Sequence, residues 1–232
     1  MRLSIVIPVL NEEKYLGTTL RYLKENCSPL TEIIVVDGGS QDNTSSIVKD
    51  TGGCVWIETR PQRAGQMNKG AALASGEILF FLHADTLPPK ALEPILQNAI
   101  QQSKLCGCFI SEFQGHSVMR KLNHWFTKSN LLWFRGGDQS CFVEKKLFHK
   151  IGGFDERYDV MEDYDIICRL KKQAPFSILP HSISISDRKI RRHGYFKINL
   201  IYSIMLSAFI LNVGPKKLYQ LYKTLWRSDS LK

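Results

Sequence analysis

The chain has 232 residues, of which 44% are hydrophobic and 23% are charged. These proportions are typical of a globular domain, and the sequence has no collagenous, low-complexity or internally repeating stretch. The formal net charge is +9, from 31 basic and 22 acidic side chains, and residues 188–232 hold ten of the basic and one of the acidic ones. The remaining residues are therefore neutral as a whole. Because no nucleic-acid-binding motif accompanies the basic segment, we expect no nucleic acid partner.

The N-terminus and the cysteines indicate a compartment. Residues 1–4 lead directly into an apolar run that Pro8 and Asn11 interrupt, which is too short for a signal peptide. The six cysteines are expected to be small buried hydrophobic residues in a reducing compartment, with half of a zinc site at Cys106 and Cys108 as the alternative. We therefore expect a cytoplasmic protein, peripheral on the inner face of the membrane if its basic tail binds lipid.

Strand and helix patterns alternate along the first half of the chain. Asn11 is expected to cap the first helix. The alternation predicts an α/β fold in which crossover helices join parallel strands. The predicted strands are Leu3–Val9, Glu32–Asp37, Cys54–Ile57 and Glu77–Leu82. One helix is predicted after Asn11, and three more are predicted at Asn43–Asp50, Ala64–Ser75 and Ala91–Gln102.

The pattern changes after about residue 104 and predicts a mixed extension of the sheet. No linker rich in Pro, Gly or Ser separates the two halves, so we expect one domain over residues 1–187, built of halves 1–104 and 105–187. The predicted elements of the second half are strands at Cys106–Phe113, Ser140–Val143 and Ser177–Ile185, and helices at Ser117–Asn130 and Glu162–Lys172.

The tail, residues 188–232, combines basic side chains with the long uncharged run Ile198–Val213. Basic residues lie on both sides of this run, which favours a helix that lies in the interface of an anionic membrane. A helical hairpin packed on the domain, or a homodimer interface, is the alternative.

Three polar loops follow predicted parallel strands, namely Asn11-Glu12, Asp37–Ser40 and His83–Asp85. Because the carboxyl ends of parallel strands meet at one edge of a sheet, where ligands bind, we expect these loops to form one site. A sugar nucleotidyltransferase would need a glycine-rich basic loop after the first strand, which Pro8–Glu13 lacks. A dinucleotide-dependent dehydrogenase would need a G-x-G-x-x-G segment, which is also missing.

Four segments, in this order, resemble those of family 2 glycosyltransferases. The resemblance implies a GT-A fold, an inverting transfer from a nucleoside-diphosphate sugar, and a divalent cation, Mn²⁺ or Mg²⁺. The short form, with Gly137-Asp138-Gln139 and Arg191-Arg192-His193, resembles a subgroup of small transferases linked to arsenosugar synthesis. The four segments are Ser4–Glu13, Val35–Thr44, Phe81–Asp85, and Gly152–Asp155 followed by Glu162-Asp163.

The resemblance implies that residues 1–104 form the nucleotide-sugar-binding half, with Asp37 accepting an N–H of the nucleotide base. A UDP-sugar is the favoured donor, although Gly38 stands where many members have a second aspartate that reads uracil. The nucleoside pocket is expected to be lined by Pro8, Val9, Glu12, Asp37 and Gly39.

Asp85 is the expected metal ligand, because it matches the last carboxylate of the family's Asp-x-Asp pattern. His83 replaces the first carboxylate, and a hydrogen bond to ribose or backbone is the alternative role for it. His193 of the tail is the candidate for a second ligand. Contacts to the donor's phosphates and sugar are expected from Arg63, Gln66, Asn68, His83, Ala84, Asp85, Gly137 and Asp138.

Glu162 and Asp163 open a predicted helix in the acceptor half, residues 105–187. An attacking hydroxyl must lose its proton, and a carboxylate within reach can accept it. Asp163 matches the family's catalytic position, with Glu162 as the second candidate. The expected acceptor is a hydroxyl of a small or lipid-linked molecule. Because the Asp-x-Asp pattern is incomplete, a non-catalytic, membrane-associated nucleotide-sugar-binding protein is the alternative function.

Overall fold

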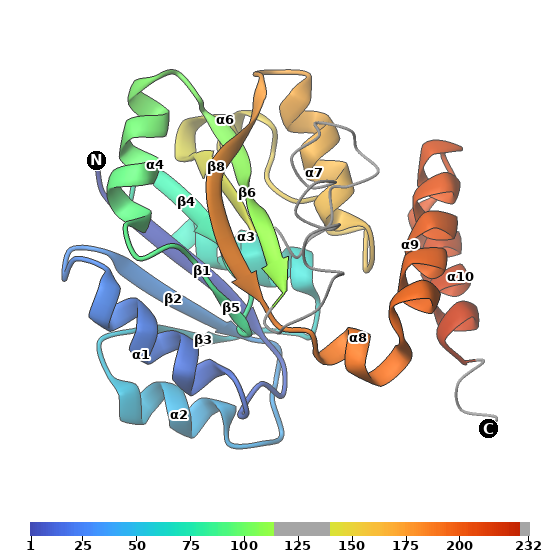
Figure 1. Ribbon diagram of the computed structural model, residues 1–232, viewed down its shortest axis with the longest axis horizontal. Helices are drawn as coiled ribbons and strands as arrows, with labels where there is room; N and C mark the ends of the chain where they lie inside the picture. Colours follow the sequence, from blue (N-terminus) through green and yellow to red (C-terminus); the bar gives the residue numbers. More distant parts are fainter. Residues whose placement is uncertain (114–139, 228–232) are drawn as a thin grey trace.

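The computed structural model describes residues 1–113 and 140–227. The predicted helix Ser117–Asn130 and the candidate site residues Gly137 and Asp138 lie outside this part. In the described part, eight strands form one sheet in the order β3-β2-β1-β4-β7-β6-β8-β5 (Figure 1). The strands are β1 (Leu3–Val9), β2 (Glu32–Asp37), β3 (Val55–Glu58), β4 (Ile78–Phe81), β5 (Thr86–Leu87), β6 (Cys106–Phe113), β7 (Cys141–Glu144) and β8 (Phe176–Ile185).

The directions of the strands bring most of their carboxyl ends to one edge. Strands β1 to β4 are parallel to one another. Strand β7 is antiparallel to both β4 and β6, and β8 is parallel to β6, so β6 and β8 point the same way as β1. Only β5 and β7 run in the opposite direction. The predicted mixed sheet is confirmed, and the end of β8 joins the edge at which the polar loops were expected.

Helices cover both faces of the sheet, which explains the continuous apolar runs of the central strands. In β1, Ile5 and Ile7 pack toward one face, whereas Val6 packs toward the other. The first face is covered by α1 (Leu16–Asn26), α2 (Thr44–Thr51) and α4 (Leu92–Gln101), and the second by α3 (Arg63–Leu73), α6 (Lys145–Lys150) and α7 (Glu162–Lys171).

Three local features bear on the sequence predictions. Helix α3 lies so close to β1 that a Cβ at Gly70 would overlap a methyl group of Val6, so this position requires glycine. The predicted cap of α1 is wrong, because the Asn11 side chain accepts a hydrogen bond from the Gln41 N–H instead (2.8 Å) and α1 begins at Leu16. All six cysteines are free thiols, and Cys106 lies buried against the helices of the second face, as expected of a small hydrophobic residue.

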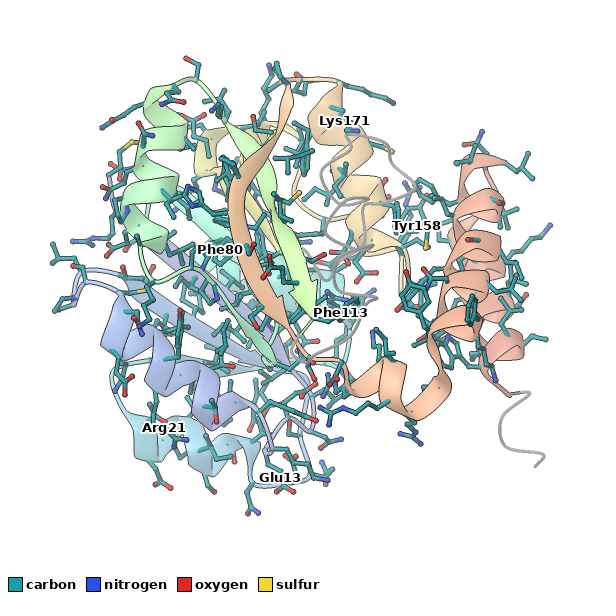
Figure 2. All side chains as sticks on the ribbon, viewed as in Figure 1. Glu13, Arg21, Phe80, Phe113, Tyr158 and Lys171 are labelled. Carbon is teal, nitrogen blue, oxygen red and sulfur yellow. The ribbon has the colours of Figure 1, made fainter. Side chains whose placement is uncertain are left out.

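The tail forms α8 (Arg188–His193), α9 (Tyr195–Ile210) and α10 (Pro215–Arg227), and α9 and α10 pair as a hairpin beside the loop before α7 (Figure 1). In this hairpin Met205 and Leu218 pack against Met161 and Tyr164 of the domain. Tyr158 also faces the hairpin (Figure 2), with its ring 6.0 Å from that of Phe209. The packed hairpin that was the alternative for the tail is therefore present. In residues 1–113 and 140–227, no helix has the length and apolar character to span a membrane.

Candidate functional site

One cavity of about 580 Å³ opens at the carboxyl edge of the sheet, and it unites most of the side chains predicted from the sequence. The loops after β1 and β4 and the start of α7 border it. Residues of α8, α9 and α10 complete the lining. The predicted residues that line it are Pro8, Val9, Glu12, Arg63, Gln66, His83, Ala84, Asp85, Glu162 and Asp163.

Arg188, which follows β8, joins two of the predicted donor residues. Its Nη1 and Nη2 each lie 2.8 Å from an oxygen of Glu12, and its Nε lies 3.0 Å from Oδ2 of Asp85. The guanidinium also lies over the ring of Tyr15, 5.0 Å from its centroid. The hydrogen bonds that Arg188 donates to Glu12 raise the pKa of the guanidinium above its ordinary value. The positively charged guanidinium of Arg188 therefore lies beside Asp85, where the resemblance predicts a divalent cation.

Arg63, at the start of α3, holds the two catalytic candidates in the same way. Its Nη1 lies 3.3 Å from Oε1 of Glu162, and its Nη2 lies 3.4 Å from Oδ2 of Asp163. The same Nη2 is 2.6 Å from Nε2 of His83. Each of two arginines thus bridges two carboxylates, and an anionic ligand in the cavity would compete with those carboxylates for the guanidinium groups.

Glu162 is the more buried of the two catalytic candidates, with 4% of its surface exposed. Burial, together with the neighbouring negative charge of Asp163, raises the pKa of Glu162 to about 7, and Arg63 opposes this rise. A carboxyl group with a pKa near neutrality can gain or lose a proton under ordinary conditions. The structure therefore places two carboxylates of different burial side by side, and both of them line the cavity.

This burial predicts an unusual dependence of stability on pH. Since the pKa of Glu162 rises from 4.5 to about 7 on folding, the folded protein binds the extra proton between these values. The free energy of unfolding should therefore decrease as the pH rises through this interval. In Glu162→Gln, which keeps the shape but does not titrate, we expect a smaller loss of melting temperature between about pH 5 and about pH 8.

The matched control is Glu25→Gln on the exposed surface of α1, which should keep the wild-type pH dependence. Thermal melts of the three proteins across this interval test the prediction. Equal slopes for the wild type and Glu162→Gln would show that Glu162 does not carry the shifted pKa.

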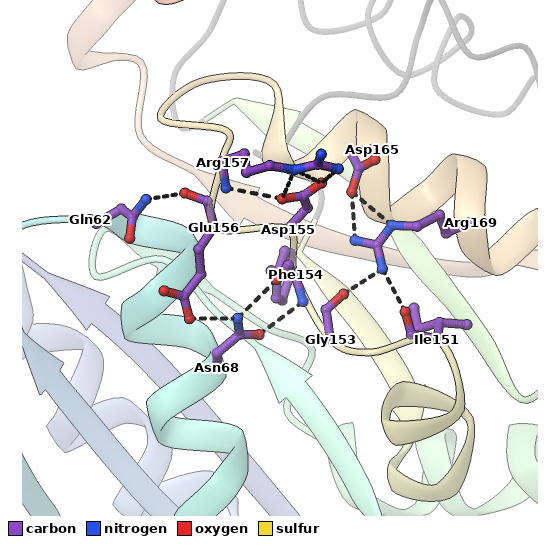
Figure 3. A network of polar contacts seen from close by, with 10 residues as sticks. All are labelled: Gln62, Asn68, Ile151, Gly153, Phe154, Asp155, Glu156, Arg157, Asp165 and Arg169. Atoms are coloured by element: carbon purple, nitrogen blue, oxygen red, sulfur yellow. Dashed lines mark hydrogen bonds and ion pairs between the residues drawn. The ribbon is translucent and has the colours of Figure 1, made fainter. Parts of the chain in front are cut away.

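A polar network fixes the loop that leads into α7 (Figure 3). Asn68 of α3 donates to the carbonyl of Phe154 (2.9 Å) and accepts from its N–H (2.8 Å). Arg169 of α7 pairs with Asp165 (2.5 Å) and donates to the carbonyl of Gly153 (2.6 Å). The loop is therefore held from both sides, which positions the start of α7. Asp165, which pairs with Arg169, does not line the cavity.

The residue before the two carboxylates has an uncommon backbone conformation. Met161 lies in the left-handed region at φ 69°, which costs a non-glycine residue free energy and which packing must maintain. Its side chain contributes to the contact with the hairpin, against Met205 and Leu218. The tail therefore helps to hold the residue that precedes Glu162.

Two predicted nucleoside residues hold a turn. Asp37 is buried, and its Oδ1 accepts hydrogen bonds from the N–H groups of Gly39 (3.0 Å) and Ser40 (2.8 Å) and from the Ser40 hydroxyl (2.7 Å). Gly39 has φ 91°, which favours glycine. One oxygen of Asp37 is thus committed to the loop, and its contact with a nucleotide base stays a prediction.

Two residues predicted to touch the donor also have structural partners. The Gln66 amide donates to the carbonyls of Val9 and Val36, both at 2.8 Å, although the residue also borders the cavity. Asn68 binds the backbone of Phe154, as described above. Both side chains therefore have defined roles in joining α3 to its surroundings.

The metal prediction can be compared with the side chains present. In the part of the chain that the structure describes, no three His, Cys, Asp or Glu side chains come together in a way that could hold a metal ion. The ring of His193 packs edge-on against Trp226, with 4.7 Å between ring centroids. Asp85 and His83 both border the cavity, and each lies beside a guanidinium group, that of Arg188 for Asp85 and that of Arg63 for His83. A cation shared with a diphosphate needs few carboxylates from the protein, and metal binding at Asp85 stays a prediction.

Sequence reasoning missed Arg188 and the tyrosines of the hairpin. Arg188 follows the carboxyl end of a strand at the same edge as Asp85, so the argument that found Asp85 could have found it once the direction of β8 was known. The tyrosines have no comparable signal, because the packing of the tail places them. Those that line the cavity are Tyr195, Tyr202, Tyr219 and Tyr222.

Comparisons with solved structures identify the fold. The structure superposes on TarS of S. aureus with a TM-score of 0.67 and 16% sequence identity, covering 96% of this chain and 69% of that one. A TarS structure in complex with UDP-GlcNAc gives the same TM-score over 97% of this chain and 72% of that one. The predicted GT-A fold is confirmed.

Curated sequences similar to this chain are also those of glycosyltransferases. A PGL/p-HBAD biosynthesis glycosyltransferase of Mycobacterium bovis is 32% identical over 183 residues, 72% of this chain and 68% of that protein. The probable glycosyltransferase YdaM of Bacillus subtilis is 24% identical over 195 residues, 73% of this chain but only 46% of that protein. Residues 4–158 match the model of glycosyl transferase family 2, and the chain belongs to this family of glycosyltransferases.

Proposed function

We propose that the protein is an inverting glycosyltransferase that moves a sugar from a nucleoside-diphosphate donor to a hydroxyl acceptor. One observation carries the proposal: Asp85 with Arg188 and Asp163 with Arg63 border the same cavity. The first pair suits a diphosphate, and the second suits the removal of a proton from an acceptor. We further propose residues 1–187 as the transferase domain, with the donor in the half formed by residues 1–104.

The proposed reaction is a single displacement at the anomeric carbon. The acceptor hydroxyl gives its proton to Asp163 and its oxygen forms the new bond to that carbon. The bond between the anomeric carbon and the diphosphate oxygen breaks on the opposite face, which inverts the configuration. The guanidinium groups of Arg63 and Arg188 stabilise the negative charge that the departing diphosphate gains. Glu162, with its raised pKa, is the second candidate for the proton.

We propose Asp85 as the side chain that would hold Mn²⁺ or Mg²⁺ together with the diphosphate. Such a cation would neutralise negative charge on the departing diphosphate. The position supports this role, because Asp85 already attracts one cationic group, the Arg188 guanidinium. His193 lies against Trp226 in this structure, so its part as a second ligand stays a prediction.

A panel of UDP-, GDP- and dTDP-sugars, with and without Mn²⁺, tests the donor in thermal melts. A ligand that binds only the folded state raises the melting temperature. We expect the largest rise with a UDP-sugar and Mn²⁺, and the TarS complex with UDP-GlcNAc supports that choice. If no nucleotide sugar raises the melting temperature under either condition, the proposed function is wrong.

We also propose that the tail binds the anionic inner surface of a membrane. Phe196, Leu200 and Ile204 are spaced four residues apart on one face of α9, and their exposed fractions are 84%, 61% and 36%. Residues 188–232 carry ten basic side chains and one acidic side chain. Each basic residue near an anionic surface contributes about 1 kcal/mol, and the apolar face adds burial.

Sedimentation with phosphatidylglycerol vesicles measures this binding. We expect the full-length protein to sediment at low salt and to be partly released at high salt, because ions screen the attraction. The double variant Phe196→Ser/Leu200→Ser should sediment less. Leu30→Ser, which changes an exposed leucine between α1 and β2, is the control and should behave as the wild type. If the double variant instead turns a dimer into a monomer and no protein sediments, the exposed face is a homodimer interface.

A further inference from the structure

Helix α9 is apolar on two opposite faces. Ile198 and Met205 lie on the face that borders the cavity, and both are buried. Phe196 and Leu200 lie on the opposite face and are exposed. A helix that is apolar all round normally has apolar neighbours on every side. One helix therefore separates the cavity from the surface that we propose to meet the membrane.

The part of the cavity that the hairpin contributes has a composition of its own, and we call it the hairpin wall. None of its side chains is charged, and four of them are tyrosines, which combine an aromatic face with a polar hydroxyl. Its only described amide side chain is that of Asn199. The wall consists of Tyr195, Ile198, Asn199, Tyr202, Met205, Tyr219 and Tyr222.

The catalytic candidates lie between the donor residues and this wall. Asp85 and Arg188 belong to the side of the cavity formed by the strand ends, whereas Met161 and Tyr164, which flank Glu162 and Asp163, pack against α9 and α10. A donor whose diphosphate lies at Asp85 leaves the hairpin side open to a second molecule. That molecule would bring its hydroxyl to Asp163 from the hairpin wall.

We propose that the hairpin wall is the acceptor subsite and that the acceptor is an amphiphile with a hydroxyl-bearing head and an apolar chain. The inference rests on the proposed function and adds the class of acceptor. Tyrosine faces and the side chains of Ile198 and Met205 favour apolar chains and the apolar faces of rings. The wall itself has no charged side chain, and Lys189 of α8, which also borders the cavity, donates a hydrogen bond to the Tyr202 hydroxyl (3.4 Å). The exposed face of α9 would hold this wall beside the lipid that supplies such an acceptor.

Binding of two simple probes tests the subsite in the full-length protein in the presence of UDP. The probes are n-octyl β-D-glucoside, used below its micelle-forming concentration, and methyl β-D-glucoside, which has the same head without the chain. Calorimetry should show tighter binding of the octyl compound to the wild type. Tyr202→Ala should weaken that binding about tenfold, as expected when an aromatic contact is removed from a desolvated pocket.

A second variant covers the case in which Tyr202→Ala does not fold. Asn199→Trp adds bulk to the wall and removes no buried side chain, so it should also weaken octyl glucoside binding. Gln220→Trp, on the exposed surface of α10, adds the same bulk elsewhere and should bind as the wild type does. Equal binding of the two probes by the wild type, or wild-type binding by Asn199→Trp, would overturn the proposal. If the wild type does not bind UDP, that result would instead count against the proposed function.

Discussion

Asp163→Asn is expected to remove glycosyl transfer while the protein still binds its donor. The substitution keeps the shape of the side chain but removes the group that accepts the proton of the acceptor hydroxyl. Loss of a general base typically lowers the rate by about 10² to 10⁴. The measurement is the rate of nucleoside diphosphate release with the donor that the thermal panel selects, together with the affinity for that donor, which should change little.

The control for this experiment lies two residues along the same helix. Asp165→Asn makes the same chemical change at a carboxylate that pairs with Arg169 rather than bordering the cavity. We expect it to lower stability and to keep most of the transfer rate. If Asp163→Asn transfers at the wild-type rate and Glu162→Gln does not, Glu162 is the base and its raised pKa becomes part of the reaction.

Asp85→Ala is expected to abolish the dependence of donor binding on a divalent cation. In the structure Asp85 is the partner of the Arg188 Nε, and Glu12 holds the rest of that guanidinium, so the fold should survive the substitution. Calorimetric titration of UDP in Mn²⁺ and in EDTA gives the two affinities. In the wild type we expect the cation to strengthen binding by about tenfold or more, which corresponds to roughly 1.4 kcal/mol, and in Asp85→Ala the two affinities should be equal.

Asp50→Ala, at the exposed end of α2, is the matched control and should keep the wild-type difference. An Asp85→Ala protein that still gains affinity from Mn²⁺ would show that another group holds the cation. It would then be worth repeating the titration with His193→Ala, since the tail supplies the other predicted ligand.

Most of the fold could be predicted because the parallel strands are buried on both faces. In β1 and β2, apolar residues must face helices on each side of the sheet, so these strands appear in the sequence as unbroken apolar runs. Strand β5 has only two residues and α6 only six, which is too short for a recognisable period. For the tail, a membrane-interface helix, a packed hairpin and a homodimer interface all stayed open, because an apolar helix has the same pattern whether it packs on protein or on lipid.

A site residue could be predicted where it comes directly after a parallel strand. Its contacts could be predicted less well where the partner lies on another segment of the chain. Asp85 and Glu12 follow parallel strands, so their meeting at one edge is a consequence of topology. Asp37 also lies at the end of a parallel strand, β2, but the hydrogen bonds that it accepts from Gly39 and Ser40 depend on the local turn. Arg188 could not be placed from sequence, because its role depends on β8 being parallel to β6.

The position of Arg188 has a consequence for the order in which substrates bind. Its side chain holds Glu12 and Asp85, and its backbone begins the segment that continues through α8 into α9. A donor that draws the guanidinium away from these carboxylates therefore acts on the segment that supports the hairpin wall. We expect heterotropic coupling between the two subsites, in which the donor alters the affinity for the acceptor. Thermodynamic linkage then requires the acceptor to alter the affinity for the donor by the same factor.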